Sequence, residues 1–375
     1  MKKKVFLFLS LFSAAASLSA QGIANGYYRF KNCVTERYLT VIDNRASFNT
    51  TSTEPDLYAL RTYADFDGKV VSDPGSIIYV EHESGGYDLH AQGVSTYGMV
   101  QQYVQARESK DYEGAYQAYA SKSGVTYYIC DPDEGVDEGP VTTNWRPNSH
   151  WYVLPVTTEG DNYFGIRPTC EHDGKYYQPF YASFPFSFAS EGMKAYYVTK
   201  YGNDMAVLEE IKEDVIPGGM PVIIECSTPD PTTNRLNLLT SGGSKPSDNI
   251  LSGTYFKCEI SEAHWNVVEN DATIRMVGVT ESGELGLITV DPSEAQYVPA
   301  NTSYLKVAAD TETELRFVDE EEFTSGISEV TVDAPTAVKQ GVYTLTGVKV
   351  ADGDKLPADL PSGVYIVGGK KVVVR

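Results

Sequence analysis

The sequence has few of the residues that carry most recognisable chemistry. It contains five Cys, five His and three Trp in 375 residues. No two cysteines form a C-x-x-C pair, which argues against a structural zinc site of thiolates. The histidines have no metal-ligand spacing, and the Gly-x-Ser-x-Gly elbow of serine hydrolases is missing. The sequence therefore contains no recognisable catalytic motif.

Basic residues are also scarce, with 30 Lys and Arg against 51 Asp and Glu and a net charge of −21. This balance excludes nucleic acid as an expected partner, because a polyanion binds clustered Lys and Arg. Beyond the N-terminus, no stretch of eighteen consecutive apolar residues occurs. No transmembrane segment is therefore expected.

The first twenty residues have the pattern of a signal peptide. A basic start at Lys2–Lys4 precedes the apolar run 5–12, and the small-residue segment 13–20 follows. The alternative is an uncleaved anchor helix, which needs about 20 apolar residues, and the run is shorter than that. Residues 1–20 are therefore predicted to direct export, which permits disulfides. The odd number of cysteines leaves at least one of them without a partner within the chain.

Aromatic and β-branched residues are abundant, and the 27 Tyr stand out. Alternation of these residues between Gly, Asn and Asp predicts strands. Within residues 26–154 such strands are expected at 26–30, 37–42, 76–81, 86–90, 125–129 and 150–154. Two segments, 56–64 and 97–108, look helical instead. The predicted fold class is all-β with minor helix.

The segment 21–160 is expected to be the first domain. Its opening, Gly26-Tyr27-Tyr28-x-Phe30-x-Asn32 followed by Arg37-Tyr38-Leu39-Thr40-Val41, resembles the first hairpin of ricin-type β-trefoil modules. The Gln-x-Trp that closes each repeat of those lectins is matched at Ser149-His150-Trp151 without the Gln. The resemblance implies a β-trefoil-like fold and a sugar ligand.

Residues 161–325 are expected to form a β-sandwich-like middle domain. Prolines every few residues after residue 162 forbid helix and favour short or edge strands. The decamer 215–224 is similar to the decamer 297–306, which starts 82 residues later. In each, an apolar pair meets Pro, a tight turn follows, and a buried-looking strand resumes. Two β-rich halves of one domain would explain this similarity, and chance recurrence is the alternative.

The segment 326–375 is expected to be a small C-terminal β domain after an acidic, solvated break near 319–326. One hairpin pairs 342–345 with 348–350, and a second pairs 364–367 with 370–374 across Gly368-Gly369. The motifs Gly341-Val342-Tyr343, Leu345-x-Gly347 and 360–375 resemble the C-terminal sorting domains of type IX secretion cargo. The resemblance implies recognition by secretion machinery, in which Gly363, Tyr365, Lys370 and Lys371 are the candidate residues. It also implies a secreted protein or one on the outer-membrane surface of a Gram-negative bacterium.

Four aromatic residues are the candidates for ligand binding, since a ring face stacks on a sugar or fills a partner's pocket. They are Trp145 and Trp151, around a turn-rich patch, and Tyr176 and Tyr177, in the proline-broken run. The alternative is that these rings fill β cores. For Trp151, which lies within an alternating strand, the core is the favoured interpretation.

The acidic run 131–139 is the one candidate metal site. Asp131, Asp133 and Asp137 place carboxylates at alternate positions, as Ca²⁺ prefers. The EF-hand spacing fails, because Gly135 stands where a third ligand belongs. A solvated acidic loop is the alternative, and no other cofactor is expected.

Together these features favour a secreted or surface-displayed, non-enzymatic binding or adhesion protein. A glycan or a host-surface protein is the expected ligand. Two alternatives stay open. One is a carbohydrate-active hydrolase whose carboxylate pair has no fixed spacing in sequence. The other is a structural component of an extracellular matrix.

Overall fold

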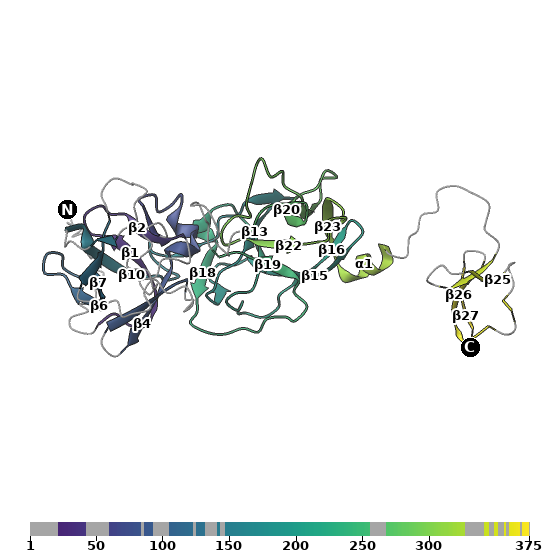
Figure 1. The fold of residues 1–375 in the computed structure, drawn as a ribbon, viewed down its shortest axis with the longest axis horizontal. Coiled ribbons are helices and arrows are strands. Elements are labelled where there is room, and N and C mark those ends of the chain that lie inside the picture. Colours follow the sequence, from purple (N-terminus) through teal and green to yellow (C-terminus); the bar gives the residue numbers. More distant parts are fainter. Residues whose placement is uncertain are drawn as a thin grey trace, which may run out of the picture. The chain divides into compact units, whose positions relative to one another are not determined.

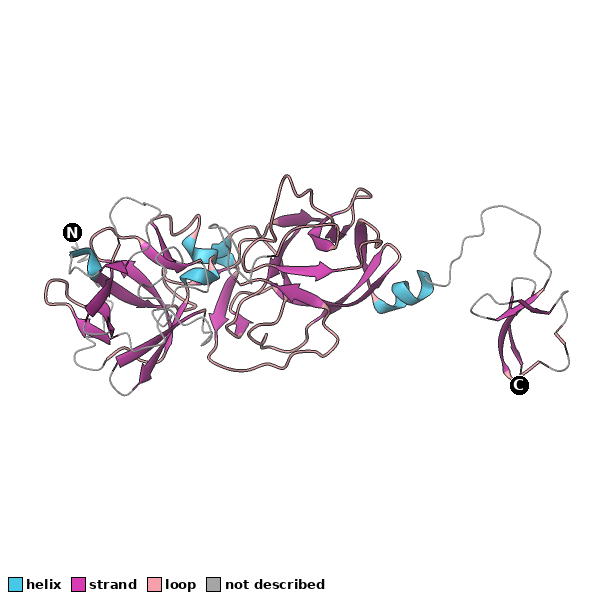
Figure 2. Ribbon diagram, viewed as in Figure 1, coloured by secondary structure: helices cyan, strands magenta, loops and turns pink. Residues whose placement is uncertain are grey.

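The computed structural model describes residues 22–42, 60–83, 86–92, 105–122, 125–131, 141–142, 147–255, 268–326, 341–344, 349–351, 356–357, 360–367 and 370–374. The predicted signal peptide, residues 1–20, lies outside these ranges. The chain divides into two compact units, Met1–Phe323 and Thr324–Arg375. Strands dominate both, so the all-β class is confirmed (Figures 1 and 2). In the described ranges, no helix is both long enough and apolar enough to cross a membrane.

The first sheet contains ten strands from the N-terminal part of the larger unit. They are β1 (Gly26–Asn32), β2 (Tyr38–Val41), β3 (Leu60–Tyr63), β4 (Ile78–Glu83), β5 (Gly86–Ala91), β6 (Gln105–Glu108), β7 (Ala115–Lys122), β8 (Val125–Ile129), β9 (Val141–Thr142) and β10 (His150–Pro155). The order is β3-β2-β1-β10-β7-β8-β9, with β4 also on β1, β5 on β4 and β6 on β7. The first and last strands therefore lie side by side, with Phe30 opposite Val153.

Six of these strands confirm the predicted ones, and two correct the helical predictions. The described residues of segments 56–64 and 97–108 include β3 and β6, which are strands. β3 pairs with β2 along its whole length, from Leu60 opposite Val41 to Tyr63 opposite Tyr38. β6 pairs in the same way with β7. Cross-strand pairing decides whether such short segments form strands, and the local sequence pattern does not record that pairing.

The second region combines a large sheet and a small one. The large sheet runs in the order β12 (Cys170–His172), β13 (Lys175–Phe180), β17 (Val222–Cys226), β15 (Lys194–Gly202), β16 (Met205–Glu210), β23 (Glu314–Val318), β21 (Leu285–Ile288), β20 (Ile274–Val279), β22 (Ser303–Lys306) and β19 (Leu251–Gly253). The small sheet has the order β11 (Phe164–Gly165), β18 (Arg235–Leu238) and β14 (Phe186–Phe188). β13 also contacts β20 and β22, so the large sheet curls back on itself.

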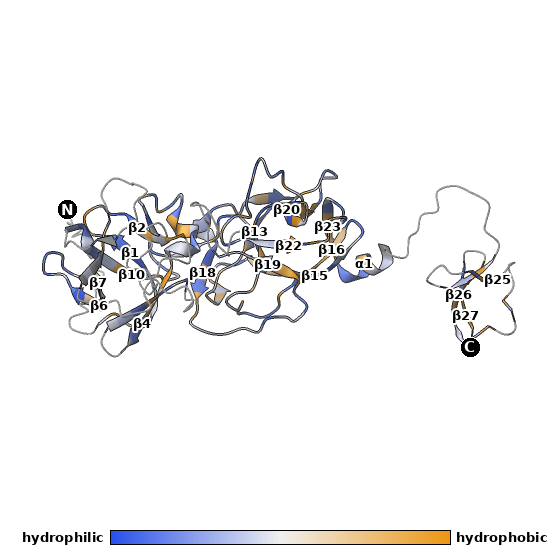
Figure 3. Ribbon diagram, in the orientation of Figure 1, coloured by the Kyte–Doolittle hydropathy of each residue, from blue (hydrophilic) through white to orange (hydrophobic). Residues whose placement is uncertain are grey.

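Apolar residues collect between the sheets, and the strands of the second region carry much of the hydrophobic colour in Figure 3. The small sheet packs on the β13 end of the large one through an aromatic cluster. Phe164, Phe180, Phe184 and Phe186 are each at most 3% exposed, and their ring centroids lie 5.6–6.5 Å apart where they touch. Edge-to-face packing at such distances adds to the burial of apolar surface.

The two similar decamers adopt the same turn. Gly219 and Asn301 occupy the same position in the two decamers, and both have left-handed backbone, with φ of 66° and 54°. The strands that follow, β17 and β22, lie close together, since the Ser303 hydroxyl donates to the Val222 carbonyl oxygen at 2.7 Å. The sequence similarity therefore corresponds to a repeated backbone conformation.

The expected acidic break contains a short helix, α1 (Glu320–Gly326). The Asp319 carboxylate accepts from the Glu322 N–H at 2.7 Å, which is the bond of a helix N-cap. Phe323 is buried and packs with Met205, Val207 and Val318. The charged residues therefore cap and surround a helix whose Phe323 ring is buried in the larger unit. The prediction of a solvated break did not include this buried ring.

The smaller unit holds a four-stranded antiparallel sheet. Its order is β25 (Lys349–Ala351), β24 (Val342–Thr344), β26 (Gly363–Val367) and β27 (Lys370–Val374). Both predicted hairpin pairings, β24 with β25 and β26 with β27, are confirmed. Tyr365 is buried and donates to the Pro361 carbonyl oxygen at 3.0 Å. Lys370 and Lys371 are exposed on β27, at one end of the strand order.

Candidate functional site

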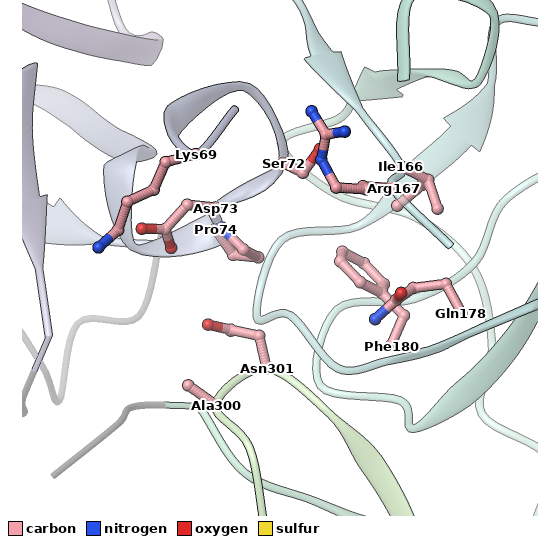
Figure 4. Close-up of a pocket in the computed structure, with 10 residues that line it drawn as sticks. All are labelled: Lys69, Ser72, Asp73, Pro74, Ile166, Arg167, Gln178, Phe180, Ala300 and Asn301. Atoms are coloured by element: carbon pink, nitrogen blue, oxygen red, sulfur yellow. The ribbon is translucent and has the colours of Figure 1, made fainter. Parts of the chain in front are cut away.

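A polar pocket of about 260 Å³ lies where the connection between β3 and β4 meets the second region (Figure 4). We call it the junction pocket. It is lined by Lys69, Ser72, Asp73 and Pro74 of that connection, by Ile166, Arg167, Gln178 and Phe180, and by Ala300 and Asn301 of the turn before β22. In Figure 4 the connection forms one wall and β13 the opposite one.

Local sequence explains the shape of the first wall. The connection makes two 3₁₀ turns, Val70–Ser72 and Pro74–Ser76, with Asp73 between them. The Asp73 carboxylate accepts from the Gly75 N–H at 2.8 Å, and Pro74 stands at the first position of the second turn, where proline is favoured. A Cβ at Gly75 would lie 2.4 Å from the Val41 carbonyl oxygen. Only glycine therefore lets the connection approach β2 so closely.

A buried arginine holds this connection in place. Arg29 of β1 is fully buried, and all five of its N–H groups have acceptors. The acceptors are Ser76 Oγ, Asn162 Oδ1 and the main-chain oxygens of Val70, Val71 and Tyr163, at 2.7–3.4 Å. Burial lowers the pKa of the Arg29 guanidinium to about 9, which leaves the group charged at neutral pH. Arg29 thus joins the first sheet to the β3–β4 connection and to the segment before β11.

Two polar atoms of the pocket lining lack partners. Ser72 Oγ and Gln178 Oε1 are buried and have no hydrogen-bond partner in the described part of the chain. The Gln178 amide N–H donates to the Pro179 carbonyl oxygen at 2.9 Å, so the amide oxygen of Gln178 is the atom that lacks a partner. A buried polar group without a partner costs about 1–3 kcal/mol. Both atoms are closed off from solvent, so a ligand or water would reach them and remove that cost only after the side chains rotate towards the cavity.

The pocket contains both signs of charge. Burial raises the pKa of the Asp73 carboxyl, while the charges of Lys69 and Arg29 oppose that rise. The Lys69 ammonium lies 3.4 Å from the centroid of the Tyr63 ring and extends away from the other lining residues (Figure 4). Asp73 is the single carboxylate among the described lining residues. A hydrolase of the two-carboxylate type needs a second carboxylate in the same cavity.

The lining therefore offers several hydrogen-bonding groups. Asp73 and Gln178 accept, and Ser72 both donates and accepts. At about 30 Å³ per water, the cavity has room for about nine water molecules. A small ring that carries several hydroxyls matches this combination of size and chemistry.

The predicted aromatic ligand-binding residues lie elsewhere. Trp151 is fully buried in the first core and its indole N–H donates to the Ile129 carbonyl oxygen at 2.9 Å, so the core interpretation favoured for Trp151 is confirmed and its role as a ligand-binding residue is not supported. Tyr177 is 9% exposed and belongs to the core of the large sheet. Tyr176 is partly buried and packs against the aromatic cluster. Trp145 lies outside the described residues.

The predicted metal ligand Asp131 is engaged by protein groups. Its fully buried carboxylate accepts from the hydroxyls of Thr35 and Thr62, and the Arg37 guanidinium lies 3.8 Å away. Asp133 and Asp137 lie outside the described residues. Within the described ranges, no group of three or more His, Cys, Asp or Glu is placed to hold a metal ion.

Sequence reasoning did not single out the residues of the junction pocket. The Asp73-Pro74-Gly75 run is a turn signal, and it marks the first wall. Gln178 lies within the proline-broken run that supplied Tyr176 and Tyr177, one position further along β13. Period two along a strand places Gln178 on the opposite face from Tyr177. The pairing of these two segments depends on contacts that are about 100 residues apart in the chain, and no local motif records it.

No protein-family model matches the chain, and no curated protein matches it.

Proposed function

We propose that this protein is a secreted or surface-displayed binding protein that holds a sugar residue of a glycan in the junction pocket. The observation that carries the proposal is the pair of buried, unpartnered atoms Ser72 Oγ and Gln178 Oε1 beside the Asp73 carboxylate. Three acceptors around one cavity favour a ligand rich in donors. Sugar hydroxyls are such donors.

The fold proposed for residues 21–160 is a β-trefoil, and strand pairing supports it. β1 pairs with β4 and with β10, the last strand of the region, and β5 contacts β6. The hairpins β2–β3 and β8–β9 extend to the two ends of the strand order. This arrangement suits a barrel with outer hairpins. For residues 161–325 we propose a sandwich-like domain, supported by the packing of the small sheet on the large one.

The proposed route to the surface uses both ends of the chain. Residues 1–20 serve as the signal peptide, and secretion machinery reads the tail 326–375. Support for the second step comes from β27, a strand at the end of the order that carries exposed Lys370 and Lys371. An edge strand offers unpaired N–H and C=O groups to a partner. Tyr365 and Gly363 support that strand from β26, its neighbour.

A glycan array tests the proposed ligand class. The full chain, its Ser72→Ala variant and a Ser282→Ala control are applied to printed glycans that include monosaccharides and longer oligomers. Ser282 is exposed on the turn between β20 and β21 and already bonds to Thr280 and Glu284. We expect Ser72→Ala to lose about tenfold in affinity, equivalent to about 1.4 kcal/mol, and the control to bind as the wild type does.

Thermal unfolding separates a lost ligand contact from a damaged fold. Ser72 Oγ has no partner in the described part of the chain, so its removal should leave the melting temperature unchanged or raise it. Weaker binding together with intact stability supports the proposal. Absence of binding to every glycan, or binding that Ser72→Ala leaves unchanged, overturns it.

A further inference from the structure

A second hollow adjoins the junction pocket. It has a volume of about 480 Å³ and is lined by Asp67, Tyr163, Arg167 and the turn 229–232. We call it the outer hollow. Like the junction pocket, it lies between the β3–β4 connection and the segment around β11. The two cavities share one lining residue, Arg167.

Arg167 forms the wall between the cavities. Its side chain is exposed, and its guanidinium donates to the main-chain oxygen of Asp67. That bond uses one of the five N–H groups of the guanidinium. In Figure 4 the Arg167 side chain rises from the segment after β11, beside Ser72 and away from Gln178. The remaining donors are therefore available where the two cavities meet.

The outer hollow differs in chemistry from the junction pocket. Its turn consists of Pro229, Asp230, Pro231 and Thr232, and Asp230 caps the 3₁₀ turn Pro231–Thr233 by accepting from the Thr232 N–H at 2.9 Å. This hydrogen bond lowers the pKa of Asp230, which keeps the carboxylate charged. The hollow thus presents the exposed surface of Pro229 between a cation and an anion.

We propose that the two cavities are successive subsites for one oligosaccharide of at least two sugar units, with Arg167 at the linkage between them. This inference rests on the proposed function. The junction pocket holds one ring beside Ser72 and Gln178. The next ring lies in the outer hollow, where Pro229 and Asp230 meet it. The Arg167 guanidinium, which lines both cavities, donates to oxygens near the linkage.

The test measures how affinity depends on ligand length. The sugar that binds best on the array is titrated calorimetrically as a monosaccharide and as its two-, three- and four-unit oligomers. We expect the two-unit oligomer to bind at least about tenfold more tightly than the monosaccharide, which corresponds to ~1.4 kcal/mol. Longer oligomers should add little beyond the two subsites.

Two variants test whether the higher affinity for the dimer comes from contacts in the outer hollow. Thr232→Trp places an indole in the hollow at an exposed position, and Arg167→Ala removes the shared wall. Thr232→Trp should reduce the affinity for the dimer to that for the monosaccharide and leave monosaccharide binding unchanged. Arg167→Ala, which alters the lining of both cavities, should lower the affinity for the dimer more than that for the monosaccharide. Lys110→Ala, which removes an exposed cation from another loop, is the matched control and should keep the length dependence.

The outcomes distinguish this inference from the proposed function. If a sugar binds through Ser72 but monomer and dimer bind equally, the two-subsite inference is wrong and the junction pocket stands. The inference is also wrong if the dimer binds more tightly but Thr232→Trp and Arg167→Ala both keep that gain. If no glycan binds, the proposed function fails first.

Discussion

The guanidinium of Arg29 donates a 2.7 Å hydrogen bond to the main-chain oxygen of Tyr163, which lies 134 residues further along the chain. Arg29 belongs to β1 of the first sheet, and Tyr163 directly precedes β11 of the second region. The same guanidinium bonds to Val70 and Val71, next to the pocket residues Ser72 and Asp73. The position of the first wall of the junction pocket therefore depends on one buried side chain.

Replacement of Arg29 should destabilise the larger unit strongly. Arg29→Met leaves five acceptors without their donor, and we expect a loss of about 3–5 kcal/mol in the free energy of unfolding. Arg29→Lys should recover little, because an ammonium has three donors and no planar fork. Urea unfolding measures both variants. A Lys variant as stable as the wild type would contradict the role of the five-bond arrangement.

The charge of Asp73 should cost stability at neutral pH. Burial raises its folded-state pKa above the ordinary value of 3.8, so the folded protein binds this proton more tightly than the unfolded chain. The cost is complete above the folded pKa and disappears as the pH falls towards 3.8. Asp73→Asn, whose amide oxygen can still accept from the Gly75 N–H, should melt higher at pH 7 and approach the wild type in acid. A constant difference at all pH values would exclude this assignment.

The tyrosines around Glu225 should make the protein sensitive to alkali. Tyr196 donates to Glu225 at 2.9 Å, and burial and this carboxylate raise the pKa of Tyr196 above 10. The same two causes raise the pKa of Tyr177 to about 12. The unfolded chain then loses these protons first, so stability falls as the pH rises above 10.

Tyr196→Phe tests this explanation. At pH 7 the variant should lose about 1–2 kcal/mol, because Glu225 loses a donor. Its stability should then fall less steeply than that of the wild type above pH 10. Urea midpoints from pH 7 to pH 11 measure the effect, with the exposed Tyr297→Phe as control. Parallel curves for wild type and Tyr196→Phe would show that Tyr196 is not responsible.

Asp131 should act as a structural residue. Asp131→Ala removes the carboxylate beside Arg37 and leaves two hydroxyls without their acceptor, and we expect a loss of about 3–5 kcal/mol. The loss should be the same in EDTA and in calcium. Thermal melts under both conditions measure it. A calcium-dependent increase in the melting temperature of the wild type that Asp131→Ala abolishes would instead assign Asp131 to a metal site.

Much of the strand content follows from the sequence, because alternation reports directly which residues face a core. The terminal hairpin is the clearest case, since Val364–Val367 and Lys370–Val374 pair as their pattern predicts. β3 and β6 were misread because each has four residues, too few for a period to be distinguished. Phe323 was missed because one buried ring within an acidic run leaves no periodic trace.

The site was less predictable than the fold. Aromatic residues drew attention as ligand platforms, but Trp151 and Tyr177 fill the interior, which is where large rings bury most surface. The junction pocket instead combines a serine, an aspartate and a glutamine from segments about 100 residues apart in the chain. Which polar atoms remain unpaired, as Ser72 Oγ and Gln178 Oε1 do, is known only when every neighbour has been placed.

The paired turns at Gly219 and Asn301 share a conformation but differ in their connections. Asn301 has a side chain, and its amide donates to Gln92 Oε1 at 2.9 Å and to the Tyr181 carbonyl oxygen at 3.0 Å. Gly219 has no atoms with which to make such bonds. The turn at Asn301 therefore connects distant segments through its side chain and lines the junction pocket, whereas the turn at Gly219 makes no such side-chain bonds. An asparagine at position 219 would have no room for the same role, because a Cβ there would lie 2.8 Å from the Tyr255 hydroxyl oxygen.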